Sequence, residues 1–507
     1  MKIYKLIISI FLFVGLSSCN DWLNIEPKDT TTETDLFATG DGYRVALNGV
    51  YAQMAETSLY GQQLNWGFLD VIAHMYMLSE LSSEYALSAK YTYTDEKVKS
   101  IIEGIWSKAY NNIANCNNII QRIDNEPAGK FAEGEIEKNV IKGEALALRA
   151  YLHLDILRLF APSMMNVEED KQLYIPYVTT YPCTFQPYTS NQDVLNKAIA
   201  DLKIAKELVG SYDLANIVQL SPINRIEDGG ADDIFFAYRG YRMNYYAVCA
   251  LLARVYNYAG MHQEAFNETE IVINALCDSY GSKCFTFTPS YTLRNGNTKL
   301  YEEIIFCLSN DQLWTIYKPY YGGEMSLYLN AWSADDLFDD NSDIRKKLVT
   351  TLNYYPVSIK NVEASGTLAN YSKDIIPMIR LGEMYYIRAE YYNSKGQTDV
   401  AFEEMDVLRA GHSCTKGRLS GDFNQALVNE ARREFIGEGQ LFFYFRFLSV
   451  RLNRLKNKLL ANYLRNRGND LATVRNSAFC VAILSNNSFI CKYNIFFRKY
   501  ELSVAIL

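Results

Sequence analysis

Apolar residues recur at steps of three to five positions through most of the chain, and this helical periodicity limits the fold more than any other feature. Such spacing puts the apolar side chains on one face of an α-helix, where they can pack against neighbouring helices. Stripes of this kind lie at residues 101–120, 145–159 and 194–209. The sequence therefore predicts a mostly α-helical fold.

Helix ends and a few strand-like runs can also be placed. Ala161-Pro162 should stop the helix before it, and Ser190 followed by Asp193 resembles a helix-capping box with Asp in place of the usual Glu. Strand-like runs are few: residues 304–307 and Tyr-rich patches near positions 174 and 354.

Two segments share a spacing that resembles the tetratricopeptide repeat. In that repeat a small residue lets two helices approach, and a glycine ends the first helix in the left-handed conformation. The segments are centred on Gly260 and Gly396, so long insertions must separate the repeats; two unrelated helical hairpins are the alternative. In either case these residues pack helices and do not form a site. At matching offsets stand Ala253, Tyr256, Ala265 and Phe266, and Ala389, Tyr392, Ala401 and Phe402.

Charge, cysteine and histidine content exclude several classes of function. The formal net charge is −8 at pH 7, whereas a nucleic-acid binder needs a concentrated basic face. The ten cysteines include no CxxC motif, which is not the pattern of a disulfide scaffold. Cys277 and Cys284 are close enough to pair, although buried thiols are the favoured state. None of the four histidines lies within metal-ligand spacing of another, so we expect no metal and no cofactor.

The first residues predict export and lipid attachment. Two lysines precede an apolar run that is too short to span a bilayer, which needs roughly 20 residues. Residues 16–19, Leu-Ser-Ser-Cys, resemble the bacterial lipobox, in which the cysteine is lipidated. We therefore predict a signal peptide at 1–18, a lipid anchor on Cys19 and an extended lead-in at 19–45. An ordinary signal peptide with an incidental cysteine is the alternative.

Three patterns that could suggest an enzyme or a metal site fail on inspection. Gly411 to Thr415 lacks the second glycine of a nucleophile elbow and is expected to be a polar loop. Asp335-Asp336 and Asp339-Asp340 could form a carboxylate pair for glycoside cleavage, but they are typical of a solvated helix start. The calcium-loop spacing from Asp339 is broken at Ile344, where a glycine is required. We predict a protein that is not an enzyme.

Several segments follow one another in an order that is more specific than any single one: Cys19 to Pro27, Ile105-Trp106 to Asn117, Ala145 to Phe160, Ala250 to Ala265, Ile379 to Ala410, Glu430 to Glu434, Gly437-Glu438-Gly439 and Phe445-Arg446. In this order they resemble the SusD/RagB family of surface lipoproteins. The resemblance implies a lipid-anchored, surface-exposed protein of the outer membrane that captures polysaccharide for a SusC-like, TonB-dependent transporter. It also implies four tetratricopeptide-type hairpins that support an irregular, loop-rich binding lobe, here within residues 46–447.

The last residues depart from the family's pattern. Residues 448–507 carry ten Lys or Arg against two acidic residues, and they contain no Gly or Pro after Gly468. We interpret them as an atypical basic tail that is dispensable for folding.

Aromatic residues supply the candidate binding site. They make up 14% of the chain, and sugar rings stack on such flat side chains while Tyr and Trp tips form hydrogen bonds. Most should lie in the core, but two loop-like stretches, residues 66–93 and the segment before Gly322-Gly323, are expected to expose their rings. The predicted glycan-binding residues are Trp314, Tyr317, Tyr320 and Tyr321, with Trp66 and Tyr76 as the second choice. Trp332 follows in the same stretch and is not among them.

A second class of function stays open at this point. The helical repeats themselves could bind a peptide, which would make the protein a tetratricopeptide-type adaptor. Exposed aromatics in the insertions favour glycan capture, whereas aromatics confined to the concave face of the repeats would favour the adaptor.

Overall fold

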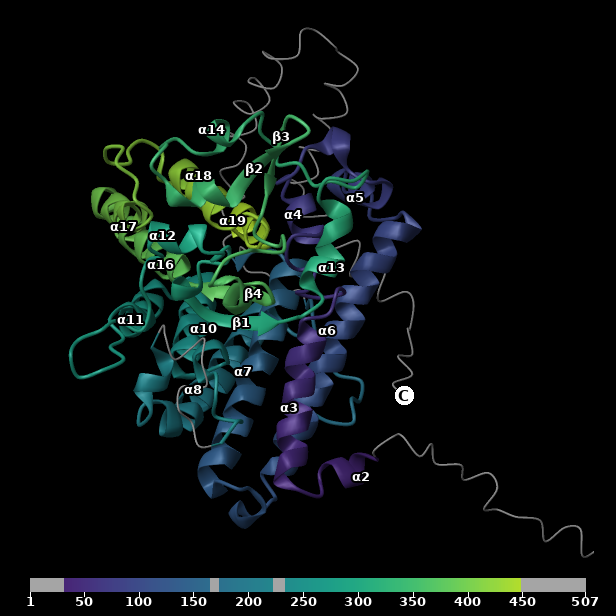
Figure 1. Cartoon of the computed structure of the whole chain (residues 1–507). Coiled ribbons are helices and arrows are strands. Elements are labelled where there is room, and N and C mark those ends of the chain that lie inside the picture. Colours follow the sequence, from purple (N-terminus) through teal and green to yellow (C-terminus); the bar gives the residue numbers. More distant parts are fainter. Residues whose placement is uncertain (1–31, 165–172, 222–232, 448–507) are drawn as a thin grey trace, which may run out of the picture.

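The computed structural model describes residues 32–164, 173–221 and 233–447. Within these ranges the chain is mostly α-helical with two small sheets, which confirms the predicted fold class. In Figure 1 the long helices of the first half of the chain run through the lower part of the molecule, whereas the strands and most of the shorter helices lie above them. No helix in these ranges is both long and apolar enough to cross a bilayer. The predicted signal peptide, Cys19 and the basic tail lie outside the described residues.

In the described ranges, eight long helices form four pairs, which we call the helical array. Neighbouring pairs are in contact because α6 packs against α7, α8 against α10, and α11 against α16. The pairs are α3 (Gly40–Met54) with α6 (Glu96–Ile123), α7 (Gly134–Phe160) with α8 (Asn191–Asp213), α10 (Tyr245–Tyr258) with α11 (His262–Ile273), and α16 (Leu381–Ser394) with α17 (Thr398–Gly411).

The two predicted repeats are the last two pairs of this array. Gly260 and Gly396 follow α10 and α16 with φ of +75° and +76°, the left-handed conformation that glycine adopts without strain. Ala253 and Ala389 are fully buried, as expected of small residues between close helices. Because α11 packs against α16, the two repeats are neighbours in space although residues 274–380 separate them in the chain.

Local sequence signals fix several helix ends. The Ser190 hydroxyl accepts the backbone N–H of Asp193 at 3.1 Å, so the predicted cap begins α8. Helix α7 ends at Phe160, directly before Ala161-Pro162, as predicted. One boundary differs: α3 begins at Gly40, inside the segment predicted to be an extended lead-in. Its first turn is capped by Thr39, and its apolar face is buried, so this part of the lead-in belongs to the array.

The segments between and after the array helices form what we call the insertion lobe, residues 55–95, 274–380 and 412–447. Many of their apolar residues belong to one hydrophobic cluster, which runs from Trp66 through Tyr317 to Phe435 and also includes Ala389 of α16 and Phe402 of α17. The lobe contains α4 (Phe68–Ile72), α5 (Ser83–Ala89), α12 (Ser290–Arg294), β1 (Ile304–Ser309), α13 (Leu313–Tyr317), α14 (Ala334–Leu337), β2 (Val349–Leu352), β3 (Tyr355–Ser358), α15 (Ala369–Ser372), β4 (Ile375–Arg380), α18 (Phe423–Glu434) and α19 (Leu441–Phe447). A short helix, α2 (Glu33–Leu36), precedes the array.

Both sheets are antiparallel pairs. Strand β1 contains the predicted run 304–307 and pairs with β4, which leads straight into α16. Strands β2 and β3 form a hairpin at the Tyr-rich patch near position 354. The patch near position 174 forms only an isolated bridge between Ile175 and Thr189, so it is not a strand.

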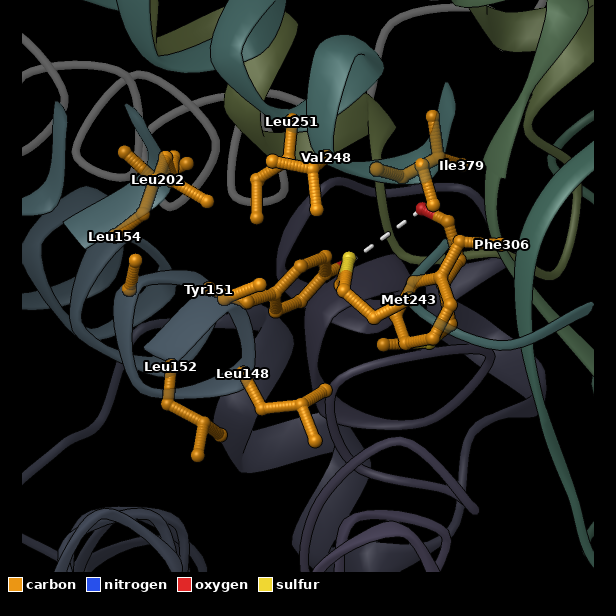
Figure 2. Close-up of a cluster of buried hydrophobic side chains, with 14 of the residues drawn as sticks. Leu148, Tyr151, Leu152, Leu154, Leu202, Met243, Val248, Leu251, Phe306 and Ile379 are labelled. Atoms are coloured by element: carbon orange, nitrogen blue, oxygen red, sulfur yellow. Dashed lines mark hydrogen bonds between the residues drawn. The ribbon is translucent and has the colours of Figure 1, made fainter. Parts of the chain in front are cut away.

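The main core joins the array to the lobe. Figure 2 shows Tyr151 of α7 among Val248 and Leu251 of α10, with Phe306 of β1 and Ile379 of β4 close by. The rings of Tyr151 and Phe306 lie 5.7 Å apart, edge to face. The β1–β4 sheet is therefore packed against the helices and connects the lobe to the array.

Candidate functional site

The two aromatic stretches singled out in the sequence lie together in the insertion lobe. The ring of Trp66 is 5.0 Å from those of Tyr317 and Tyr320, edge to face in both cases. Tyr85 is 5.9 Å from Tyr320. We call this group the aromatic cluster; its members are Trp66, Tyr76, Tyr85, Trp314, Tyr317, Tyr320 and Tyr321.

Part of the predicted site is buried, which corrects the expectation that these rings are exposed. Trp66, Tyr76 and Tyr317 are 0%, 2% and 3% exposed, so none of them can offer a face to a sugar. Residues 313–317 form α13, not a loop, and Leu313 and Tyr317, four residues apart, both lie on its buried side. Tyr76 pairs with Leu329 through a backbone bridge, and its hydroxyl donates to the Trp66 carbonyl at 2.8 Å.

The remaining predicted residues form the accessible side of the cluster. Trp314, Tyr320 and Tyr321 are half-buried, and we call these three the platform. The rings of Trp314 and Tyr321 lie 6.1 Å apart. The Tyr320 hydroxyl accepts a hydrogen bond from Gln62 Nε2 at 3.2 Å, which ties the platform to the segment that carries Trp66. The structure thus supplies a supported group of rings rather than a flexible loop.

A hairpin adjoins the platform. A Cβ placed on Gly322 would lie 3.2 Å from Leu352, the last residue of β2, so the chain after Tyr321 passes directly beside the hairpin. At the hairpin's turn, Asn353 donates to the Tyr328 hydroxyl at 2.9 Å, and Tyr354 is 93% exposed. The sequence predicts only strand-like residues here. Its one local hint of a turn is Asn353, because asparagine tolerates positive φ.

A glycine turn supports the cluster from within the lobe. Gly437 and Gly439 both have φ of +70°, and Asp70 accepts the backbone N–H of Gly439 at 3.1 Å. A Cβ on Gly439 would come within 2.5 Å of the Leu64 carbonyl oxygen, so only glycine fits this position. The Gly437-Glu438-Gly439 segment noted in the sequence therefore holds the residues around Trp66 in place.

Charged groups fix that turn to the rest of the lobe. Glu438 accepts from Lys360 at 2.6 Å and from Arg380 at 2.9 Å, and Arg380 also reaches Glu434 at 2.6 Å. Arg345 bonds Glu434 and Glu430 of α18 at 2.9 and 3.0 Å. We call this the charge network; its members, all buried, are Glu303, Asp343, Arg345, Lys360, Arg380, Arg409, His412, Glu430, Glu434 and Glu438. Burial alone would raise the pKa of Glu434, but Arg380, His412 and Arg345 outweigh it and hold that pKa well below its usual range.

One trio inside the network has the composition of a metal site. Ligand atoms of Glu303, His412 and Glu434 lie within 4.8 Å of one another, although the sequence gave no metal-binding spacing. Arg380 contacts both carboxylates, at 3.3 Å for Glu303 and 2.6 Å for Glu434. A guanidinium in that place repels a cation and satisfies the oxygens that would bind it, so these contacts favour an ion-pair network.

The aspartates considered in the sequence as catalytic groups form helix caps and ion pairs. Asp336 and Ser333 form the capping box of α14, as expected of a helix start. Asp335 pairs with Lys346, and Asp339 pairs with Arg409 at 3.2 Å. Residue Gly411 is the last of α17, and Asp340 accepts the N–H of Thr415 at 2.6 Å, so the predicted polar loop follows that helix.

Together the paired-helix array and the loop-rich lobe define an α-helical protein whose irregular insertions carry the accessible aromatic groups. Two family models match the chain: "Starch-binding associating with outer membrane" over residues 21–220 and "SusD family" over residues 253–474. The chain belongs to the SusD/RagB family. The second match continues into the basic tail, as far as residue 474.

Curated relatives are distant and are matched in part. SusD-like protein P2 of Formosa agariphila is 24% identical over 276 residues, which are 54% of this chain and 46% of that protein. SusD-like protein P25 of the same organism is 22% identical over 211 residues, 41% of this chain and 38% of that protein. The matches therefore span less than half the length of these relatives.

Solved structures share the fold over most of the chain. A putative sugar binding protein from Bacteroides vulgatus has a TM-score of 0.62 at 21% identity, covering 80% of this chain and 86% of that one. A SusD superfamily protein from Bacteroides thetaiotaomicron has a TM-score of 0.58 at 21% identity, covering 80% and 88%. A SusD-like carbohydrate binding protein from Bacteroides vulgatus has a TM-score of 0.59 at 19% identity, covering 82% and 84%.

Proposed function

We propose that this protein captures a polysaccharide or oligosaccharide at the outer surface of a cell and passes it to a TonB-dependent outer-membrane transporter. The family description, starch binding in association with the outer membrane, supports the ligand class and the location. Two of the similar structures are described as sugar or carbohydrate binding proteins. The observation that carries the proposal is the platform, Trp314, Tyr320 and Tyr321, on the accessible side of the aromatic cluster.

The platform has the properties that sugar recognition requires. Its rings can stack on the C–H faces of pyranoses, and hydroxyl and indole N–H groups at their edges can bond to sugar hydroxyls. Buried Trp66 and Tyr317 lie behind it, so its rings need little ordering when a ligand binds. Loops fixed on a rigid scaffold commonly carry binding residues in this way.

Binding without turnover is part of the proposal. The aspartates nearest in kind to a glycosidase pair, Asp335 and Asp339, are held by Lys346 and Arg409. A glycosidase needs two carboxyls that flank the scissile bond, whereas each of these two is engaged in an ion pair. We therefore expect the protein to release no reducing ends from a polysaccharide that it binds.

The anchor and the partner belong to the same proposal. A lipid on Cys19 would hold the protein at the outer membrane. The SusC-like transporter is the partner that the family resemblance implies. The adaptor function is less well supported, because Trp332 and Tyr354, 60% and 93% exposed, belong to the insertion lobe and not to the array.

The decisive test replaces one ring of the platform. Trp314→Ala should weaken binding by about 2 kcal/mol, roughly thirtyfold, because it removes an aromatic anchor from a binding surface. Affinity is measured by titration with the polysaccharide that wild-type protein selects from amylopectin, xylan, mannan, pectin and chondroitin sulfate. Trp314→Phe, which keeps a ring, should retain most of the affinity.

Tyr280→Ala is the matched control. This tyrosine is 94% exposed and follows α11, which lies at the lower left of Figure 1, whereas β2 and β3 lie near the top. Equal affinities for Trp314→Ala, Tyr280→Ala and wild type would refute the platform. Thermal melting of each variant shows whether a loss of binding reflects a loss of folding.

A further inference from the structure

Tyr354 stands in a conformation that disfavours its side chain. Leu352 pairs with Tyr355, so the β2–β3 hairpin is closed by two residues, Asn353 and Tyr354, with φ of +49° and +71°. A two-residue loop with both φ positive is a type I′ turn, in which the second residue is commonly glycine. A bulky residue with positive φ is strained, and its persistence points to a function.

The exposure of Tyr354 removes packing as a reason for a tyrosine at this position. The Tyr354 side chain is 93% exposed, so its ring gains nothing from burial. The neighbouring Asn353 has a partner, the Tyr328 hydroxyl, and the ring of Tyr328 packs 5.1 Å from that of Tyr355. The hairpin is therefore well fixed without Tyr354, and neither packing nor turn chemistry accounts for a tyrosine there.

The location suggests what the ring contacts. Leu352, two residues before Tyr354, lies against Gly322, which directly follows platform residue Tyr321. We infer that Tyr354 is a second sugar-contacting residue, which binds a different unit of the same glycan chain from the unit held by the platform. This inference rests on the proposed function and deepens it, because it makes the ligand an oligosaccharide of several units rather than a mono- or disaccharide.

Tyr354 and the platform belong to different elements, the β2–β3 hairpin and α13 with the residues after it. One pyranose ring offers its C–H face to a given aromatic ring, so the inference requires a second sugar unit at Tyr354. A short ligand would then occupy the platform alone, while a longer chain would contact both. Two linked contacts then raise affinity for the longer chain without any change at the platform.

Tyr354→Gly should raise the stability of the protein and lower its affinity for a long glycan. Glycine adopts the type I′ turn without strain, so the melting temperature should rise by about 1 °C. Affinity for a hexasaccharide of the selected polysaccharide should fall about tenfold, because one ring contact is lost. Affinity for the disaccharide should stay within twofold of wild type. Tyr354→Trp, which keeps a ring, should preserve hexasaccharide binding.

The comparison with the platform separates the possible failures. Trp314→Ala should weaken binding of both the hexasaccharide and the disaccharide, whereas Tyr354→Gly should affect only the longer chain. If Trp314→Ala loses affinity and Tyr354→Gly keeps wild-type hexasaccharide binding, the inference is wrong and the platform stands. If wild type binds a polysaccharide and neither variant changes binding, the platform and the inference are both wrong. If wild type binds none of the five polysaccharides, the proposed function fails and the inference fails with it.

Discussion

The helical array and the insertion lobe are packed in different ways. In the array, the helices bury long apolar stripes together with separate ion pairs such as Arg149 with Asp201 and Arg254 with Glu383, and the glycines that follow α10 and α16 have no atoms within 4 Å of an added Cβ. In the lobe, β4, α18 and the turn at residues 437–439 meet in one connected network of buried charges, and Gly439 lies directly against backbone. The helices of the array are thus set largely by local pattern, whereas the irregular segments of the lobe depend on partners far apart in the chain. Substitutions in the charge network and at its glycine turn should accordingly be more damaging than substitutions at the exposed ends of the array helices.

The strongest test of this difference is removal of one carboxylate from the charge network. Glu434→Ala removes one of the buried carboxylates that pair with Arg380 and Arg345, which should cost about 3–5 kcal/mol of stability. The array offers a control in Glu404, which pairs with Arg388 at 2.7 Å between α16 and α17 but is partly exposed. Glu404→Ala should cost at most about 1 kcal/mol. Denaturant unfolding of both variants measures the difference, and equal losses would contradict it.

A matched pair of glycines gives the next largest effect. Gly396 and Gly439 have similar φ, +76° and +70°, but only Gly439 has a carbonyl oxygen 2.5 Å from an added Cβ. Gly396→Ala should cost about 1 kcal/mol from backbone strain alone. Gly439→Ala adds a clash with Leu64 and should cost well over 2 kcal/mol, because the backbone near Trp66 must move. Similar melting temperatures for the two variants would show that the turn can shift freely.

One buried titratable group in each region should make stability depend on pH, with opposite sign in the array and in the lobe. In the array, burial raises the pKa of Glu390 to about 8, above its ordinary 4.5. Between these values the folded protein keeps a proton that the unfolded chain has lost, so stability falls as pH rises. In the lobe, burial and nearby Lys360 lower the pKa of Lys299 to about 7, below its ordinary 10.5. Here the unfolded chain holds the extra proton, so stability rises with pH above about 7.

Each of these groups should change stability by about 1 kcal/mol between pH 7 and 8, in opposite directions. Glu390→Gln should remove the decrease, and Lys299→Met should remove the increase. Hydrogen exchange between pH 7 and 8, corrected for intrinsic rates and compared at α16 and at β4, reports the two regions separately. The same pH slope in both variants as in wild type would show that neither group titrates as described.

The contrast also explains what the sequence could predict. Gly260, Gly396 and Ser190 act within a few residues of their own position, and their predicted roles are confirmed. The burial of Trp66 and Tyr317 depends on contact between segments about 250 residues apart, which periodicity does not encode. Which of these rings reach solvent is decided by how the lobe folds around them.

Tyr354 was missed for a related reason. Its patch was interpreted as a strand because tyrosine is common in strands. The turn inside the patch contains no glycine or proline, which are the usual signals. The charge network was also not predicted, since charged residues near the end of a chain are normally assigned to the surface.

The position of residues 274–380 has a consequence for how the family can vary and for how the chain folds. They join α11 to α16, two helices in direct contact, so the insertion is a long loop that leaves the array and returns to it. The entropic cost of closing such a loop grows only with the logarithm of its length, about 0.6 kcal/mol for each doubling. Inserted segments of very different size can therefore leave the helical frame nearly unchanged. Because the α11–α16 contact forms only once this loop has closed, the last helix pair should dock late in folding.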